Sequence, residues 1–151
     1  MQTFLPIADF KQSAEVLDNK RLGKQRVECK QILICLGEQV GPHVPELSRW
    51  RNHPAVKMWQ GYEPALILYS VIVCAEWRAR GFKDSLLPQF LDNYVRRGRL
   101  KISFPYWFGF DELHASHRSN LLRKNYEHYS QFGWTEPNNL PYYWPASLAP
   151  V

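Results

Sequence analysis

The stretch that decides the fold is ALILYSVIVCAEWRAR, residues Ala65–Arg80. It is apolar almost all round until Glu76, it follows Pro64, and Gly81 closes it. The apolar part is too short to cross a bilayer, so it reads as a helix buried on nearly every side. Such a helix is expected to form the centre of the fold.

Shorter helical patterns lie on both sides of this central segment. The apolar spacing and the capping residues predict helices over Asp9–Leu17, Asn19–Leu36 (capped by Asp18), Asn52–Gly61 (capped by Asn52), Pro88–Arg97 and Ser116–Gln131. Gly23, inside the second helix, indicates either close packing or a later helix start. Lys101–Phe108 and Trp134–Pro145 contain proline and many aromatics, so they are predicted to be irregular and extended, respectively.

Composition favours one compact domain with a polyanionic partner. The chain has 151 residues, no repeat and no flexible linker, which predicts a single domain over 1–151 with an extended aromatic tail over 134–151. The fold class expected is an all-α orthogonal helical assembly. A formal charge of +5 and an aromatic share of 15% suit nucleic acid, since aromatic rings stack on exposed bases.

Several classes of protein are disfavoured. The three cysteines show neither CxxC nor metal-ligand spacing, so they read as buried thiols in a reducing compartment, and neither metal nor cofactor is expected. The N-terminus lacks the pattern of a signal peptide, which predicts a cytoplasmic protein with no membrane partner. Without GxxxxGKS, GxSxG or GxGxxG motifs, the chain does not resemble kinases, α/β-hydrolases or Rossmann enzymes.

The first candidate site is KRLGKQRVE, residues 20–28. On a helix, Arg21, Lys24 or Gln25, and Glu28 share one face, while Arg26 projects to one side. A carboxylate set among cations can stabilise the positive sugar that develops when a glycosidic bond breaks. The alternative is a solvated helix face with weak Arg–Glu pairs.

The second is SRWRNHPAVKMW, residues 48–59. Arg49 and Arg51 flank Trp50 just before a helix N-terminus, which suits phosphate and base contacts. The alternatives are that Trp50 packs inward and that His53 only caps the helix.

The third candidate site is ELHASHRSNLLRKNYEHY, residues 112–129. His114, His117 and Arg118 lie near the predicted helix start, with Lys124 two turns on, which suggests a grip on DNA phosphates. The HxxH spacing is a weak zinc signal because no third ligand accompanies it. Core packing explains the leucines of this stretch but not its histidines and cations.

These stretches resemble the phage-type pyrimidine-dimer DNA glycosylase (endonuclease V) family. The similarity covers Asn52–Asp84, Leu113–Trp134 and Arg21–Gln31. The resemblance implies an endonuclease V-like helical fold and an N-terminal amine that attacks the sugar of the damaged nucleotide. It also implies a Glu that supports the resulting Schiff base, strand cleavage by β-elimination, and arginines that hold the kinked DNA backbone.

Two positions depart from the family pattern. The family has a small second residue, and Gln2 in its place predicts that Met1 is kept and offers the amine. In an ungapped match the family's Glu falls on Gly23 and its later Arg on Arg26, which leaves Glu28 as the replacement carboxylate. The predicted catalytic residues are Met1, Glu28 and Arg26, and the predicted DNA-binding residues are Arg21, Lys24, Arg49, Trp50, Arg51, His53, His114, His117, Arg118 and Lys124.

The function predicted is excision of a damaged or modified pyrimidine from double-stranded DNA, with AP-lyase activity if the amine reacts and without it if water attacks instead. One alternative is a DNA-binding module that recognises such bases without catalysis. Another is an enzyme on free nucleotides, which would show little salt-dependent affinity for duplex DNA.

Overall fold

The computed structural model describes residues 1–43, 49–98 and 101–146, and these residues form helices and no strand. The helices are α1 (Phe10–Val16), α2 (Asn19–Cys35), α3 (Pro54–Lys57), α4 (Glu63–Ala79), α5 (Leu87–Arg96), α6 (Asp111–Lys124) and α7 (Tyr126–Tyr129), followed by the short 3-10 helix η1 (Ser130–Phe132). The all-α fold class is therefore confirmed.

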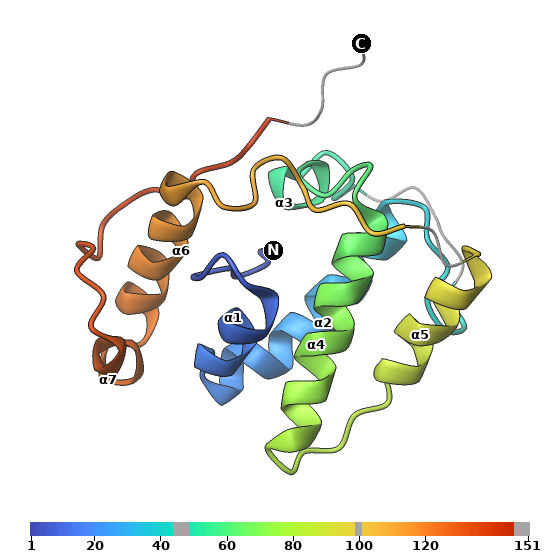
Figure 1. The fold of residues 1–151 in the computed structure, drawn as a ribbon, viewed down its shortest axis with the longest axis horizontal. Coiled ribbons are helices and arrows are strands. Elements are labelled where there is room, and N and C mark those ends of the chain that lie inside the picture. The colour runs from blue at the N-terminus through green and yellow to red at the C-terminus, as the bar shows by residue number, and fades with distance from the viewer. Residues whose placement is uncertain (44–48, 99–100, 147–151) are drawn as a thin grey trace.

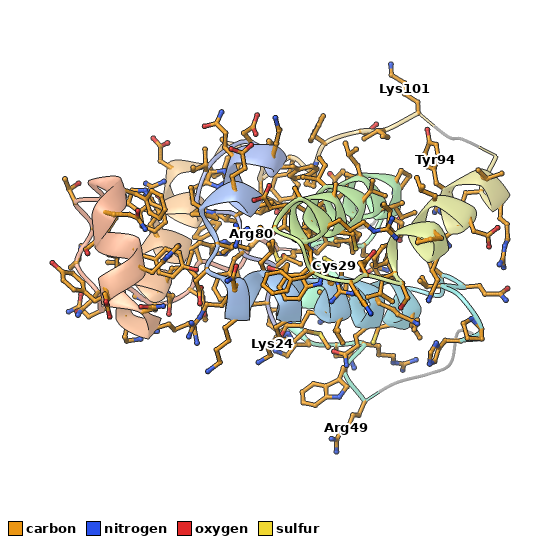
Figure 2. The ribbon with its side chains drawn as sticks, turned by 90° about the horizontal axis from the view of Figure 1, so that it is seen from below. Lys24, Cys29, Arg49, Arg80, Tyr94 and Lys101 are labelled. Carbon is orange, nitrogen blue, oxygen red and sulfur yellow. The ribbon has the colours of Figure 1, made fainter. Side chains whose placement is uncertain are left out.

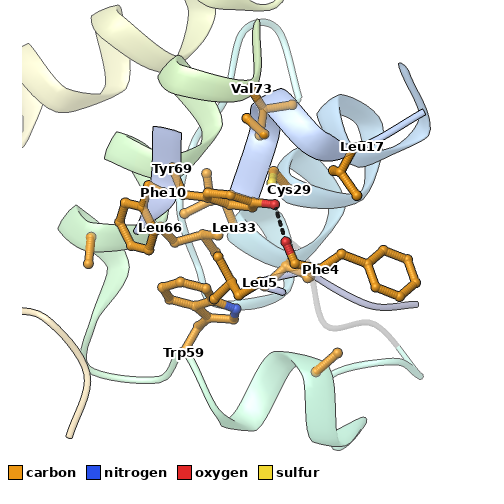
Figure 3. Close-up of a cluster of buried hydrophobic side chains, with 14 of the residues drawn as sticks. Phe4, Leu5, Phe10, Leu17, Cys29, Leu33, Trp59, Leu66, Tyr69 and Val73 are labelled. Carbon is orange, nitrogen blue, oxygen red and sulfur yellow. Dashed lines mark hydrogen bonds between the residues drawn. The ribbon is translucent and has the colours of Figure 1, made fainter. Parts of the chain in front are cut away.

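Helix α4 is the centre of the fold, as its sequence predicts. It contacts α1, α2 and α5, and α2 crosses behind it in Figure 1. Leu66, Tyr69 and Val73 are among its buried residues and pack in the hydrophobic cluster of Figure 3. The buried hydroxyl of Ser70 donates to the carbonyl of Leu66, so this polar group is satisfied inside the helix.

Gly23 allows α2 to approach α4 closely. A Cβ atom built at Gly23 would lie 2.8 Å from Cη2 of the Trp77 indole, which α4 presents to α2. Since α2 begins at Asn19, close packing explains this glycine, and a late helix start does not. The position has no room for a carboxylate.

The first seven residues form a non-helical segment that fills the junction between α6 and the central helices (Figure 1). Gln2, Thr3, Phe4 and Leu5 are all buried. Because buried backbone groups need partners, side chains from several helices bond this segment. The chain's N-terminus is therefore held inside the architecture.

The third helix is shorter than predicted. It ends at Lys57, and the chain continues in turns up to Gly61. Its cap is His53, whose Nδ1 accepts the N–H of Ala55, so the Asn52 prediction is wrong and the capping interpretation of His53 is confirmed.

The last predicted helix, Ser116–Gln131, is also wrong in its bounds. Helix α6 begins five residues earlier, at Asp111, and ends at Lys124. Asn125 leaves the helical conformation, with φ −154° and ψ 77°, and its side chain accepts the N–H of His128 to start α7. Asparagine side chains compete for backbone groups in this way, which makes them better caps than helix interiors.

The aromatic tail runs as extended chain along α6, as predicted for Trp134–Pro145. Ser119 bonds Pro137 and Leu140, and Asn120 donates to the Leu140 carbonyl. Tyr143 donates its N–H to Ser116. Residues 147–151 of the predicted tail lie outside the described residues.

None of the helices in residues 1–43, 49–98 and 101–146 has the length and apolar character that a membrane crossing requires.

Candidate active site

A pocket of about 410 Å³ opens where the N-terminal segment meets α2, the end of α6 and the tail. Its volume lies in the range of small-ligand sites. Its lining residues come from all four elements and are Met1, Gln2, Phe4, Lys20, Arg21, Lys24, Glu28, Lys124 and Tyr142. The shared face predicted for Arg21, Lys24 and Glu28 is thus one wall of this pocket.

Glu28 is the carboxylate in this lining. Its side chain is 13% exposed, its Oε1 lies 4.0 Å from Nζ of Lys24, and its Oε2 accepts the N–H of Gln2 at 3.4 Å. Burial raises the pKa of Glu28, and the positive charges of the Met1 amine and Lys24 oppose that rise. The N-terminal amine and the carboxylate therefore share the pocket closely enough to interact electrostatically.

Four cationic side chains line the same pocket as this carboxylate: Lys20, Arg21, Lys24 and Lys124. Arg21 is paired with Asp18 at 3.0 Å. Burial lowers the pKa of Lys124, and the neighbouring charges of Arg21, Arg123 and Lys24 lower it further. Cations that repel one another in this way create a positive potential that attracts phosphate.

Arg26 does not line the pocket. Its guanidinium bonds Oδ1 of Asp84 at 2.8 and 2.5 Å and lies 5.2 Å from the centroid of the Trp77 ring. Asp84 also accepts the N–H groups of Leu86 and Leu87, at the start of α5. This network joins α2, α4 and α5, so its position does not support the predicted catalytic role of Arg26.

The two histidines of α6 are buried, which contradicts the predicted phosphate grip. Nδ1 of His117 accepts the N–H of Leu5 at 2.9 Å, and Nδ1 of His114 lies 2.7 Å from the Leu5 carbonyl. Nε2 of His114 accepts the N–H of Gly109, so its Nδ1 carries the proton and donates to Leu5. Burial lowers the pKa of His114, and it lowers that of His117 to about 3. Both rings are therefore neutral and hold the N-terminal segment.

The guanidinium of Arg118 also bonds groups within the protein. Its Nε donates to Glu136 of the tail at 2.5 Å, and its Nη1 donates to the Pro6 carbonyl at 2.8 Å. The prediction that Arg118 binds DNA is therefore not supported by its position. Of the predicted residues on α6, Lys124 is the one that reaches the pocket.

The Arg49–Arg51 turn is on the surface. Trp50 is 45% exposed, so the inward-packing alternative is wrong, and the guanidinium of Arg49 lies 5.0 Å from its ring centroid. Arg51 is exposed as well. Figure 2 shows Arg49 and Lys24 on the same side of the molecule.

A row of rings links this turn to the pocket. Trp50 lies 6.1 Å from His53, His53 lies 5.8 Å from Trp144, and Trp144 lies 5.5 Å from Tyr142 in the pocket wall. Burial lowers the pKa of His53, and the charge of the N-terminal amine adds to this effect. The row of rings therefore passes close to the N-terminal amine at His53.

The residues that sequence reasoning missed here are Phe4, Lys20, Tyr142 and Trp144. Phe4 and the tail residues are aromatic neighbours in the fold (Phe4 and Tyr142 lie 6.4 Å apart) but are more than 130 positions apart in sequence, so no spacing rule joins them. Lys20 belongs to the basic stretch on α2 and could have been found there.

The groups in this pocket are those of an enzyme that reacts covalently with a sugar. An α-amine, a partly buried carboxylate and four cations in one pocket suit covalent chemistry on a sugar that carries phosphate groups. In the described part of the chain, no three His, Cys, Asp or Glu side chains are grouped to hold a metal ion.

The chain belongs to a known family of such proteins: the family described as pyrimidine dimer DNA glycosylase matches residues 1–88. This range contains every pocket residue except Lys124 and Tyr142. The similarity that the sequence shows over Leu113–Trp134 lies outside the matched residues. No curated protein and no solved structure matches the chain significantly. Family membership makes DNA the substrate, with glycosylase activity as the activity of the family.

Proposed function

We propose that the protein excises a damaged or modified pyrimidine from double-stranded DNA, with the Met1 amine as nucleophile and Glu28 as its supporting carboxylate. The observation that carries this proposal is their joint position in one cation-lined pocket. Gln2 does not exclude the amine, because Gln2 is almost fully buried and Met1 lines the pocket beside it.

The chemistry follows from these groups. The neutral amine attacks C1′ of the damaged nucleotide, and the bond from C1′ to the base breaks, so the base leaves with the electron pair and takes up a proton. The C1′–O4′ bond then breaks and O4′ takes up a proton, which leaves the open-chain sugar joined to Met1 as a protonated imine. Loss of a proton from C2′ expels the 3′ phosphate by β-elimination, and water hydrolyses the imine. An α-amine suits the first step because α-amines as a class lose their proton far more readily than lysine.

Glu28 has two tasks in this sequence. Its negative charge stabilises the cationic sugar and the protonated imine, and its carboxylate can take and return protons at C2′ and the amine. Burial raises its pKa, which improves its proton transfer near neutral pH. Since it is the pocket carboxylate on a rigid helix, its distance from the amine is set by the fold.

DNA binding is supported by the surface around the pocket. Lys20, Lys24 and Lys124 are exposed and placed to contact phosphates that flank the reacting sugar. Arg49 and Arg51 extend the positive surface beside Trp50 and the ring row. Exposed aromatic rings stack on unpaired bases, which an enzyme that acts on a base must take out of the duplex.

The test uses labelled duplexes that carry a cyclobutane pyrimidine dimer, a modified pyrimidine or no lesion. We expect base release and strand cleavage on one of the lesion duplexes. Glu28→Gln is expected to lower the rate by about 10²–10⁴-fold with DNA affinity retained. Binding of the lesion without base release by the unaltered protein would contradict the proposal and favour the non-catalytic module. Alkali-labile sites without spontaneous cleavage would show that water is the nucleophile.

A further inference from the structure

Gln25 is a buried amide whose two polar atoms both bond the N-terminal segment. The residue is 1% exposed and lies on the inner side of α2. Its Oε1 accepts the N–H of Phe4 at 2.7 Å, and its Nε2 donates to the carbonyl of Gln2 at 2.8 Å. The side chain thus bonds the N–H group that follows Thr3 and the C=O group that precedes it, as a neighbouring β-strand would.

Two further side chains complete this seat. The hydroxyl of Tyr69 donates to the carbonyl of Phe4 at 2.6 Å, the bond drawn in Figure 3, and lies 3.4 Å from Oε1 of Gln25. The indole of Trp59 donates to Oγ1 of Thr3 at 2.9 Å. Within this seat Gln25 is the side chain that bonds nearest to the amine, because the Gln2 carbonyl is one residue from Met1.

Gln25 and Glu28 lie three positions apart on α2, so they are one helical turn apart on neighbouring faces. A single rigid helix therefore carries both the seat of the N-terminal segment and the carboxylate that faces the amine. The N–H of Gln2, which reaches Oε2 of Glu28, belongs to the same segment. The distance between the Met1 amine and the Glu28 carboxylate therefore depends on the contacts that α2 makes with the N-terminal segment.

We propose that Gln25 is a positioning residue that fixes the Met1 amine relative to Glu28. This inference rests on the proposed function for its consequence in catalysis, since misplacement of a reacting group by about 1 Å can cost on the order of 10²-fold in rate. Its structural content, that Gln25 seats the N-terminus, can be measured without any activity.

The chain offers a direct probe, because it has two methionines, Met1 at the pocket and Met58 in the core. Methyl-¹³C methionine labelling gives one NMR signal for each. Gln25→Leu removes both bonds to the segment, and Gln25→Glu keeps the acceptor for Phe4 while placing an oxygen against the Gln2 carbonyl. Asn93→Leu is the matched control, because Asn93 is a buried amide on α5 that donates to the Gln39 carbonyl, away from the pocket.

We expect the Met1 signal to narrow and move toward that of mobile methionine in both Gln25 variants, with the Met58 signal unchanged, and neither signal to change in Asn93→Leu. An unchanged Met1 signal in a folded Gln25 variant would overturn the proposal. Gln25→Glu supplies this result if Gln25→Leu does not fold.

The second measurement is borohydride trapping on an abasic duplex under single-turnover conditions. Both Gln25 variants are expected to trap on the order of 10²-fold more slowly, with DNA affinity within about twofold and Asn93→Leu unchanged. An equal loss in Asn93→Leu would mean that lost stability explains the effect, which would overturn the positioning role. If the unaltered protein forms no adduct, the proposed function fails, and the Met1 signal still decides whether Gln25 seats the N-terminus.

Discussion

Two polar stretches that look alike in sequence have different environments in the fold: one is exposed at the pocket, and the other is buried. The stretch of residues 20–28 on α2 leaves Lys20 and Lys24 open to solvent around the pocket, whereas the stretch of residues 114–120 on α6 uses its polar side chains inside the protein. His117 and Arg118 bond the N-terminal segment, and Ser119 bonds the tail.

The cause of this difference lies in what surrounds each helix. Extended chain covers α6 on two sides, and its backbone N–H and C=O groups need partners that the α6 side chains supply. Helix α2 meets extended chain at Gln25, which is buried and does not line the pocket, whereas Lys20 and Lys24 are exposed and line the pocket. A polar side chain that lies beside extended chain can therefore serve to bond that chain's backbone, and need not bind a ligand.

The largest effect is expected from moving the amine. A Gly-Ser extension before Met1 shifts the amine by two residues from a segment whose position is fixed by its bonds to α2 and α6. We expect loss of base excision and of adduct formation, with thermal stability unchanged. The same extension at the C-terminus is the control, and full activity of the N-terminally extended protein would refute a role for this amine.

A smaller effect separates the two helices directly. Lys24→Ala is expected to weaken DNA binding and to reduce the slope of log K against log salt by about 1, with stability unchanged, because Lys24 is exposed. Arg118→Ala is expected to lower the free energy of unfolding by about 2 kcal/mol or more, because Glu136 loses its partner, with the salt slope unchanged. The measurements are the salt dependence of DNA binding and unfolding in denaturant, each for both variants. A destabilised Lys24→Ala protein, or a reduced salt slope in Arg118→Ala, would contradict the comparison.

A third prediction concerns how closely α2 lies on α4. Gly23→Ala places a methyl group against the Trp77 ring, and overpacking of this kind costs about 1–3 kcal/mol. The expected result is a lower free energy of unfolding in urea. A gain of about 1 kcal/mol, as for alanine at an open helix position, would show that the two helices are not in contact there.

The smallest effect concerns His117 and pH. Its pKa falls from 6.5 to about 3 on burial, so the folded protein binds fewer protons than the unfolded chain in this range. The stability from neutral His117 is therefore present above about pH 6.5 and is lost as pH falls, by at most about 1.4 kcal/mol per pH unit. His117→Asn keeps an acceptor for Leu5 without titrating, so its stability should fall less between pH 7 and 5. Equal losses in both proteins would contradict a neutral buried ring.

Much of the fold can be predicted from local patterns. Helix α4 follows from its apolar length, α1 lies within the predicted range Asp9–Leu17, and α2 lies within the predicted range Asn19–Leu36. The failures are at α3, where His53 supplies the cap, and at Asn125, where a side-chain cap breaks a helix. Both depend on competition for a few backbone hydrogen bonds, which residue patterns do not resolve.

The site is less predictable than the fold. Helical spacing correctly places Arg21, Lys24 and Glu28 on one face, because that face depends on α2 alone. Which carboxylate meets the amine depends on how the N-terminal segment passes α2, which involves Gln25 and Tyr69 from two helices. The burial of His114 and His117 depends on the same path, so a sequence pattern alone assigns them to the surface.

The central claim is that the Met1 amine, held at the pocket beside Glu28, is the reacting group. The most direct test is borohydride reduction of the protein with an abasic or dimer-containing duplex, followed by peptide mapping of the adduct. A covalent link between DNA and the α-nitrogen of Met1, absent after Nα-acetylation, is the predicted result. An adduct on Lys20, Lys24 or Lys124, or base release with no adduct at all, would contradict the claim.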